Sequence, residues 1–124
     1  MLIGMYGLKK DIDLSFLTGR ELTQVAIGTF QVQFHFDEDV SIYVEAEFRY
    51  FDGQQEWVWR QEPNSTQVAA RTVALLGSSI TSFRSNENGT LALTFSNGHL
   101  LTILDSSKEY RSYDITRPGV TIIV

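Results

Sequence analysis

The chain repeats one pattern of apolar residues and glycines at a separation of roughly half its length of 124 residues. The matching segments have offsets of 58, 61 and 62, and they are Leu22 and Val25 with Ile80 and Phe83, Gly28-Thr29-Phe30 with Gly89-Thr90-Leu91, and Phe48-Arg49-Tyr50-Phe51 with Tyr110-Arg111-Ser112-Tyr113. A solenoid requires three or more short repeats, so one long repetition indicates two related halves. We expect a single domain over residues 1–124, with an internal repeat of about 11–62 and 66–124.

Each half contains a β-hairpin pattern whose apolar residues fall on one face. In the first half, apolar and polar residues alternate on both sides of the acidic triplet Asp37-Glu38-Asp39. If that triplet is the loop, every apolar residue meets another across the hairpin, and the expected pairs are Phe36 with Val40, Phe34 with Ile42, Val32 with Val44 and Phe30 with Ala46.

The second hairpin turns at Ser96-Asn97-Gly98, and two loop lengths compete for it. The Asn-Gly pair favours a two-residue type I′ turn, but that register breaks the apolar pairing. A three-residue loop with Gly98 in the left-handed region keeps it, with the pairs Leu93–Leu101 and Leu91–Ile103. We expect the longer loop because it buries four large side chains.

One helix is expected between the halves, from about Ser65 to Leu76. Asn64 and Gln67 have the spacing of an N-terminal capping pair, and Gly77 stands where a left-handed residue ends a helix. In both halves a spacing of three residues interrupts the alternation before the hairpin, which indicates a β-bulge or a short helical turn. The expected fold class is α+β: a mainly antiparallel β-sheet from two duplicated hairpin-containing units, related by a pseudo-twofold, with one connecting helix.

The net charge of −5 is concentrated in the first half. Between Asp37 and Glu62 there are eight acidic residues and two arginines, a local balance of −6, so the remainder sums to +1. Such a field repels phosphate backbones, so we expect no nucleic acid partner and favour a basic protein partner. The alternative is a solvated acidic face that only keeps the protein in solution.

Cysteine is absent, which rules out disulfides and thiol chemistry and is typical of a reducing compartment. The apolar N-terminal residues precede Lys9 and Lys10, the reverse of a secretory signal, and no apolar run is long enough for a membrane helix. We therefore expect a cytoplasmic protein with no membrane partner.

No catalytic, metal or cofactor site is expected. The sequence has no nucleophile-elbow, zinc-hydrolase, dinucleotide or phosphate-loop motif. Glu45 and Glu47 would share a strand face as a carboxylate pair, but Arg49 continues that face and opposes acid–base chemistry there. His35 and His99 lie beside the hairpin loops, and we expect both to be lone surface residues.

Aromatic residues of the first half are the strongest candidates for contact with a partner. Trp57 and Trp59 share one face of a strand and have acids beside them, a composition typical of interface hot spots. Packing in the core is the alternative for both rings. The expected partner-binding residues are Asp37, Glu38, Asp39, Glu45, Glu47, Asp52, Glu56, Trp57 and Trp59.

The second half carries a distinct series of turn glycines and core residues: Leu75-Leu76-Gly77, Asn88-Gly89-Thr90-Leu91, Phe95-x-Asn97-Gly98, Tyr110-x-Ser112-Tyr113 and Pro118-Gly119. In these residues the chain resembles an uncharacterised family of small bacterial β-rich proteins. The resemblance implies a fold and little chemistry, because the shared residues serve turns and the core. Families of this size include immunity proteins of bacterial toxin systems, so the resemblance implies an immunity-type antagonist by analogy.

Three hypotheses for function follow. We favour a non-catalytic protein-binding module that presents the segment from Asp37 to Glu62, with an immunity-type antagonist as one form. The second is a structural protein that forms a homodimer through the apolar C-terminal strand or the face of Trp57 and Trp59. The third is a small-ligand-binding protein or an enzyme with a pocket enclosed by the sheet.

Overall fold

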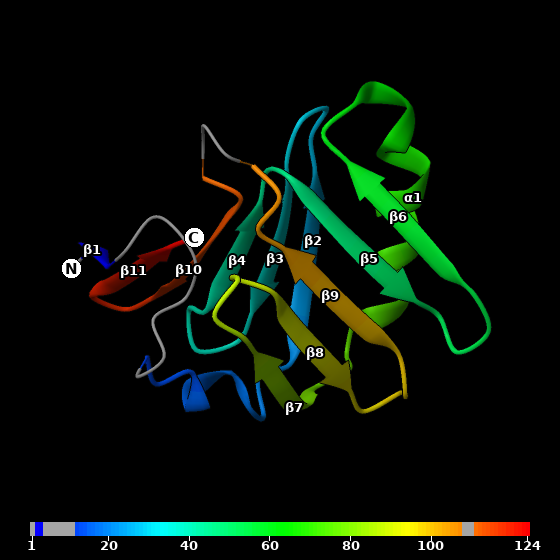
Figure 1. The fold of residues 1–124 in the computed structure, drawn as a ribbon. Coiled ribbons are helices and arrows are strands. Elements are labelled where there is room, and N and C mark those ends of the chain that lie inside the picture. Colours follow the sequence, from blue (N-terminus) through cyan, green and yellow to red (C-terminus); the bar gives the residue numbers. More distant parts are fainter. Residues whose placement is uncertain (1, 4–11, 108–110) are drawn as a thin grey trace.

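The computed structural model describes residues 2–3, 12–107 and 111–124, and in them short strands alternate with tight connections (Figure 1). The strands are β1 (Leu2–Ile3), β2 (Leu22–Ile27), β3 (Val32–Phe36), β4 (Ser41–Val44), β5 (Glu47–Phe51), β6 (Glu56–Arg60), β7 (Ile80–Ser85), β8 (Leu91–Phe95), β9 (Leu100–Leu104), β10 (Tyr113–Arg117) and β11 (Val120–Ile123). The helical segments are the 3₁₀ turns η1 (Ser15–Leu17), η2 (Pro63–Ser65) and η3 (Thr72–Leu75), and the α-helix α1 (Thr66–Arg71).

The strands form two sheets, and each sheet takes strands from both halves of the chain. The first sheet has the order β1-β11-β10-β4-β3-β2, and the second has the order β6-β5-β9-β8-β7. In the first sheet, the hairpin β10–β11 of the second half extends β2, β3 and β4 through the pair β10–β4. In the second sheet, the hairpin β5–β6 of the first half extends β7, β8 and β9 through the pair β5–β9. Among these pairs only β1 with β11 is parallel. The expected fold class, a mainly antiparallel α+β protein, is confirmed.

One hydrophobic core lies between the two sheets. Phe34 of the first sheet packs edge-on against Phe48 of the second, with ring centroids 5.5 Å apart. Phe36 stacks on Phe95 across the same interface, with centroids 6.4 Å apart. The inward residues of both hairpins are therefore shared by one core, so neither half has a core of its own.

The two halves meet at backbone segments related by a pseudo-twofold axis. Glu21 and Ser79 form a single antiparallel bridge across this axis. The hydrogen bonds on either side correspond in pairs: Gly19 N–H to Ile80 O (2.7 Å) matches Gly77 N–H to Leu22 O (2.9 Å), and Ile80 N–H to Arg20 O (2.9 Å) matches Leu22 N–H to Ser78 O (2.9 Å). Both β2 and β7 then carry a β-bulge where the alternation is interrupted, as the sequence predicts.

Both hairpins have the predicted registers. The observed pairs include Val32–Val44, Phe34–Ile42, Leu93–Leu101 and Leu91–Ile103. In the second loop Gly98 has φ +88°, and Phe95 N–H donates to His99 O across three loop residues, as expected. The expected contact of Phe30 with Ala46 is wrong, because β3 begins only at Val32 and the Phe30 side chain is 55% exposed.

The structure corrects two offsets of the repeat. Leu22 faces Phe36 beside one bulge and Ile80 faces Phe95 beside the other, so equivalent hairpin residues are 59 positions apart and not 61. A shift of two residues keeps every side chain on the same face, so the alternation cannot distinguish these alignments. Tyr113 and Phe48 occupy equivalent places, which gives an offset of 65 for the last hairpin in place of 62, because the connection before β10 is longer than that before β5.

The connecting helix is shorter than expected. Only Thr66–Arg71 is α-helical, and 3₁₀ turns precede and follow it. The expected Asn64 cap is wrong, since α1 begins after Ser65 without a side-chain cap, and the Thr66 hydroxyl donates instead to Pro63 O at 2.8 Å. Gly77 has φ +83° at the predicted end. In the described part of the chain, no helix is both long and apolar enough to cross a membrane.

A buried contact ties the β7–β8 connection to the residues around β10. The Tyr113 hydroxyl donates to Gly89 O at 2.6 Å, and the Ser112 hydroxyl donates to Asp105 at 2.7 Å. Gly89 has φ +90°, and a Cβ at this position would lie 2.6 Å from the Asp105 Cβ. The close approach and the backbone conformation both require glycine here.

We expect Gly89→Ala to lower the free energy of unfolding by about 2–4 kcal/mol, because left-handed strain adds to the clash with Asp105. Gly98→Ala is the matched control. Gly98 has φ +88° but nothing within 4 Å of the added Cβ, so its cost is about 1 kcal/mol. Urea unfolding of the two variants measures the difference, and equal costs would contradict the proposed contact.

Candidate functional site

The nine residues expected to bind a partner lie in several separate places. The acidic triplet forms the β3–β4 loop, Glu45 lies in the β4–β5 connection, and Trp59 is buried. The outward-facing residues of the second sheet include Glu47 and Glu56, and Asp52 and Trp57 lie together at the β5–β6 turn. The segment from Asp37 to Glu62 therefore does not form one continuous acidic surface.

Asp37, the first residue of the β3–β4 loop, has a structural role. The Asp37 carboxylate accepts a hydrogen bond from Glu21 N–H at 3.1 Å and lies 3.5 Å from the Arg20 guanidinium. Ser96 is the equivalent residue of the second hairpin, and its hydroxyl accepts from Ser79 N–H at 3.0 Å. Both side chains satisfy the backbone beside the pseudo-twofold bridge, which explains Asp37 without a partner.

Glu38 and Asp39 both have φ +57°, a conformation in which most side chains are strained. We expect Asp39→Gly to raise the free energy of unfolding by about 0.5–1 kcal/mol, because glycine adopts this conformation without a Cβ clash. Asp37→Gly is the matched control and should lower stability, since it removes the bond to Glu21 N–H. Thermal unfolding of both variants tests the opposite signs, and destabilisation by Asp39→Gly would show that the side chain has another role.

Acids on the outer face of the second sheet are paired with arginines. The Glu47 carboxylate lies 3.7 Å from Arg49 and 3.5 Å from Arg60, and Glu56 lies 3.9 Å from Arg49. The local charges largely cancel, so this face offers no strong field for a basic partner.

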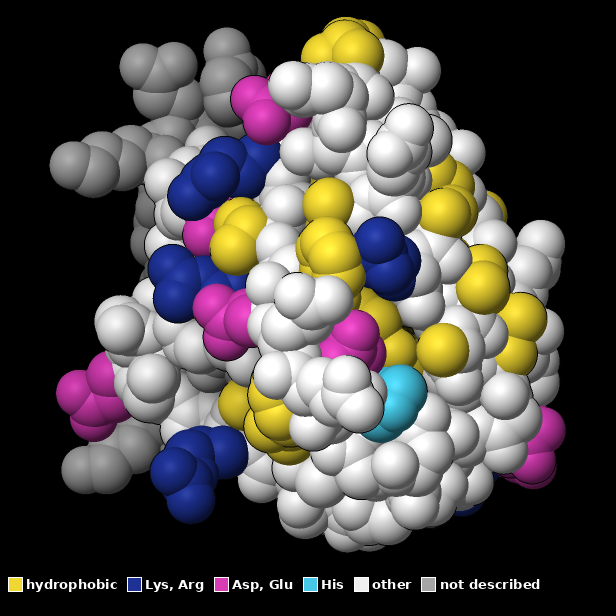
Figure 2. All heavy atoms as spheres, turned by 90° about the vertical axis from the view of Figure 1, so that its right-hand side faces the viewer, with side chains coloured by type: hydrophobic (Ala, Val, Ile, Leu, Met, Phe, Trp, Pro, Cys, Tyr) yellow, Lys and Arg dark blue, Asp and Glu magenta, His cyan; other side chains and the backbone are white. Residues whose placement is uncertain are grey.

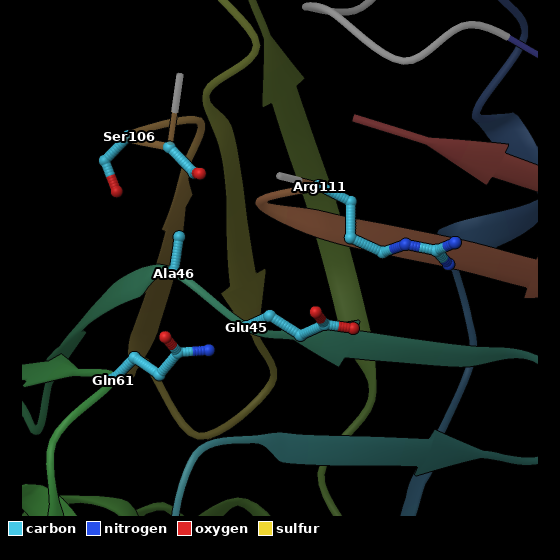
Figure 3. Close-up of a pocket in the computed structure, with 6 residues that line it drawn as sticks. Glu45, Ala46, Gln61, Ser106 and Arg111 are labelled. Atoms are coloured by element: carbon cyan, nitrogen blue, oxygen red, sulfur yellow. The ribbon is translucent and has the colours of Figure 1, made fainter. Parts of the chain in front are cut away.

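Glu45 lines a cavity of about 480 Å³ between the β4–β5 connection and the start of β10. In Figure 3 the side chains of Glu45 and Gln61 enter this space from one side and Arg111 lies on the other. Arg111 already pairs with the buried Asp114 carboxylate at 3.1 Å, and burial raises the pKa of Asp114. The cavity is thus lined by polar residues, with its one arginine committed to a buried acid.

Trp57, Asp52 and Arg71 form a compact group at the start of β6. The Arg71 guanidinium of α1 lies over the Trp57 ring, 3.6 Å from its centroid. The indole N–H of Trp57 donates to Asp52 Oδ2 at 3.0 Å. Because both its face and its edge are held, the half-buried ring is fixed in orientation. Such a stack is a cation–π contact, which also orders the long arginine side chain.

Asp52 organises the β5–β6 turn around this group. Its Oδ1 accepts from the backbone N–H groups of Gln54 and Gln55, each at 2.9 Å. These two hydrogen bonds, with the one from Trp57, lower the pKa of Asp52 to about 2, the largest cause being the bond from Gln55. The carboxylate is therefore ionised at physiological pH.

His99 of the second half completes the site. Its Nδ1 lies 2.6 Å from the Tyr50 hydroxyl, and desolvation raises the pKa of that phenol. A pocket of about 240 Å³ opens between these residues and α1, lined by Tyr50, Asp52, Gln54, Arg71, Ala74 and His99. We refer to Tyr50, Asp52, Trp57, Arg71 and His99 as the Trp57 corner.

Trp59 does not belong to this surface. Its ring is fully buried and stacks on Phe48 with centroids 5.3 Å apart. Its indole nitrogen has no hydrogen-bond partner within the described residues. The expectation that Trp59 contacts a partner is corrected in favour of the core alternative, because β6 turns this ring between the sheets while Trp57 lies at the open end.

The equivalent corner of the first sheet shows which of these residues the fold requires. The pair Tyr50–Trp57 corresponds to the pair Ile115–Ile122. The residue that follows each hairpin loop is His99 in the second sheet and Val40 in the first. Aliphatic side chains thus fill the same places elsewhere in this molecule. Packing therefore does not demand Tyr50, Trp57 or His99 at these places.

Sequence reasoning found two residues of this corner and missed the other three. Asp52 and Trp57 were expected, whereas Tyr50, Arg71 and His99 were not. His99 was expected to be a lone histidine, and the structure instead places it against Tyr50. No group of three or more histidine and acidic side chains able to hold a metal ion is found in the described ranges.

The fold and this corner define a β-rich protein whose two sheets exchange hairpins and which, within the described residues, carries a polar aromatic group at the corner of one sheet. The chain belongs to a family of unknown function, DUF6188, whose model matches residues 14–124. No curated protein and no solved structure matched the chain. The resemblance to an uncharacterised family is confirmed, and bacterial origin and likeness to immunity proteins stay predictions.

Asp52 gives the corner a testable pH dependence. Its pKa is about 2 in the folded protein against an ordinary value of 3.8, so the ionised carboxylate stabilises the fold fully above pH 3.8. This contribution is lost as the pH falls towards 2. We expect Asp52→Asn to lower the melting temperature at pH 7 and to match the wild type near pH 2. Thermal unfolding between these limits measures the gap, and a constant gap would contradict a charge-dependent role.

Proposed function

We propose that this protein is a non-catalytic protein-binding module and that the Trp57 corner is its contact surface. The observation that carries the proposal is the stack of Arg71 on the face of the Trp57 ring, whose N–H edge donates a hydrogen bond to Asp52. Tryptophan and arginine are the residue types most enriched at interface hot spots, and a ring already fixed in place loses little entropy on binding.

Two exposed apolar residues follow Arg71 closely along the chain. Val73 lies in η3 and Leu76 directly follows it, and the two residues are 48% and 45% exposed. Figure 2 shows this face of the molecule, where hydrophobic side chains lie among basic, acidic and histidine side chains. An apolar centre with charged neighbours matches the composition of specific interfaces better than a solvated surface.

The charges of the corner favour a partner with both signs of charge. Arg71 and Asp52 differ in sign and lie on the same pocket, so the broad acidic surface expected from composition is replaced by a small mixed one. An immunity-type antagonist in the cytoplasm is one form of this function, and it requires a toxin encoded beside the protein.

We expect Arg71→Ala to weaken partner binding at least about tenfold, the loss that corresponds to about 1.4 kcal/mol. Affinity capture from a lysate of the source organism with wild-type bait identifies the partner, and calorimetry compares the variants. Arg84→Ala is the matched control, since Arg84 is an exposed arginine on β7 at the far edge of the second sheet.

Two results would contradict this proposal. Equal binding by Arg71→Ala and the wild type, with both folded, would remove the corner from consideration. Capture of a second copy of the chain alone, with a dimer by light scattering, would favour the homodimer hypothesis instead.

A further inference from the structure

β6 and β11 occupy equivalent places in the two sheets, although β6 is the last strand of its sheet and β11 is followed by β1. Phe48 pairs with Ile103 in the second sheet as Tyr113 pairs with Val44 in the first. The next strand outward is then β6 beside β5 and β11 beside β10. By this correspondence Glu56 and Val58 of β6 match Thr121 and Ile123 of β11.

A further strand already covers the outer edge of β11. Val124 donates a backbone hydrogen bond to Tyr113 and accepts one from it. In an antiparallel pair every second residue bonds to the neighbouring strand, so the backbone groups of Thr121 and Ile123 point away from β10. β1 lies along this edge in parallel, with Leu2 beside Thr121 and Ile3 beside Ile122. The fold therefore accepts an added parallel strand at this position.

The matching groups on β6 point away from the sheet. Arg60 N–H donates to Ser65 Oγ at 3.3 Å and Arg60 O accepts from Glu62 N–H at 2.7 Å, so Arg60 faces away from β5. The same alternation turns the backbone groups of Val58 and Glu56 outward. At the other end, the bond from Asp52 N–H to Gln55 O agrees with this register. Within the described residues, no hydrogen bond is found at these outward groups of Glu56 and Val58.

We infer that the free edge of β6 at Glu56–Val58 binds an extended apolar segment of the partner protein, parallel to β6, as β1 binds β11. This inference rests on the proposed function and specifies how the partner binds. A segment on this edge places one side chain beside Trp57, on the face where Arg71 stacks, because cross-strand neighbours share a face. Backbone hydrogen bonds supply the register and the Trp57 corner supplies a side-chain contact, as in strand addition to other exposed edges.

A synthetic peptide of residues Met1 to Lys10 is the probe, because its Leu2–Ile3 segment is the one that pairs with the equivalent edge. Added to the ¹⁵N-labelled full chain, it should shift the amides of Glu56, Trp57 and Val58 in a saturable way and slow hydrogen exchange at Val58. No shift at these amides, or shifts confined to Thr121 and Ile122, would overturn the inference.

Val58→Pro removes the N–H group that points outward from β6. The hydrogen bonds between β6 and β5 are made by the residues on either side of Val58, so they are retained. We expect it to abolish the peptide shifts and to keep slow exchange at Trp57 and Trp59, which shows that β6 is intact. Val58→Thr is the matched control, since it keeps the N–H and the branched shape and should bind like the wild type. Unchanged peptide binding by Val58→Pro would overturn the inference.

The captured partner separates this inference from the proposed function. Loss of the partner by both Val58→Pro and Arg71→Ala supports strand addition at the Trp57 corner. Loss by Arg71→Ala with retention by Val58→Pro would overturn strand addition and leave the proposed surface standing. Retention by both variants would overturn the two together.

Discussion

The exchange of hairpins between the halves determines the rest of the structure. Each half forms a three-stranded meander that ends in a strand with an unpaired edge, β4 in one half and β9 in the other. A hairpin of the opposite half covers each of these edges, through the pairs β4–β10 and β5–β9. An exposed edge invites uncontrolled pairing, and Phe36 of the first half stacks on Phe95 of the second. Neither half therefore satisfies its backbone or its core alone.

This arrangement provides an internal comparison of residues in equivalent environments. Where both halves carry similar residues, as with Gly19 and Gly77 beside the bridge, the backbone explains them. Where they differ in kind, as with His99 and Val40, packing does not explain the polar residue. The comparison assigns Asp37 to the fold, because Ser96 makes the equivalent bond, and it singles out the Trp57 corner.

The sequence predicted local pairing well and long-range arrangement poorly. Alternation predicted the Phe34–Ile42 pair because a slip of one residue would expose the whole apolar face. It could not predict which strands lie side by side in a sheet, because alternation reports burial and not neighbours. The site shows the same limit: Trp57 was expected from composition, whereas Arg71 reaches it only through the turn and helix that follow β6, and His99 reaches it only because β9 pairs with β5.

The two halves also differ in the segments that precede them along the chain. The segment before β2 supplies β1, which pairs with β11. The segment before β7 supplies η2 and α1, which follow β6 along the chain. The same fold unit is thus preceded by a covering strand in one case and by a helix in the other. The helix brings Arg71 onto Trp57. Beside that stack, the backbone groups of Glu56 and Val58 still point outward from the edge of β6. One consequence of connectivity therefore places an apolar ring, an exposed arginine and an open strand edge together at one corner of the molecule.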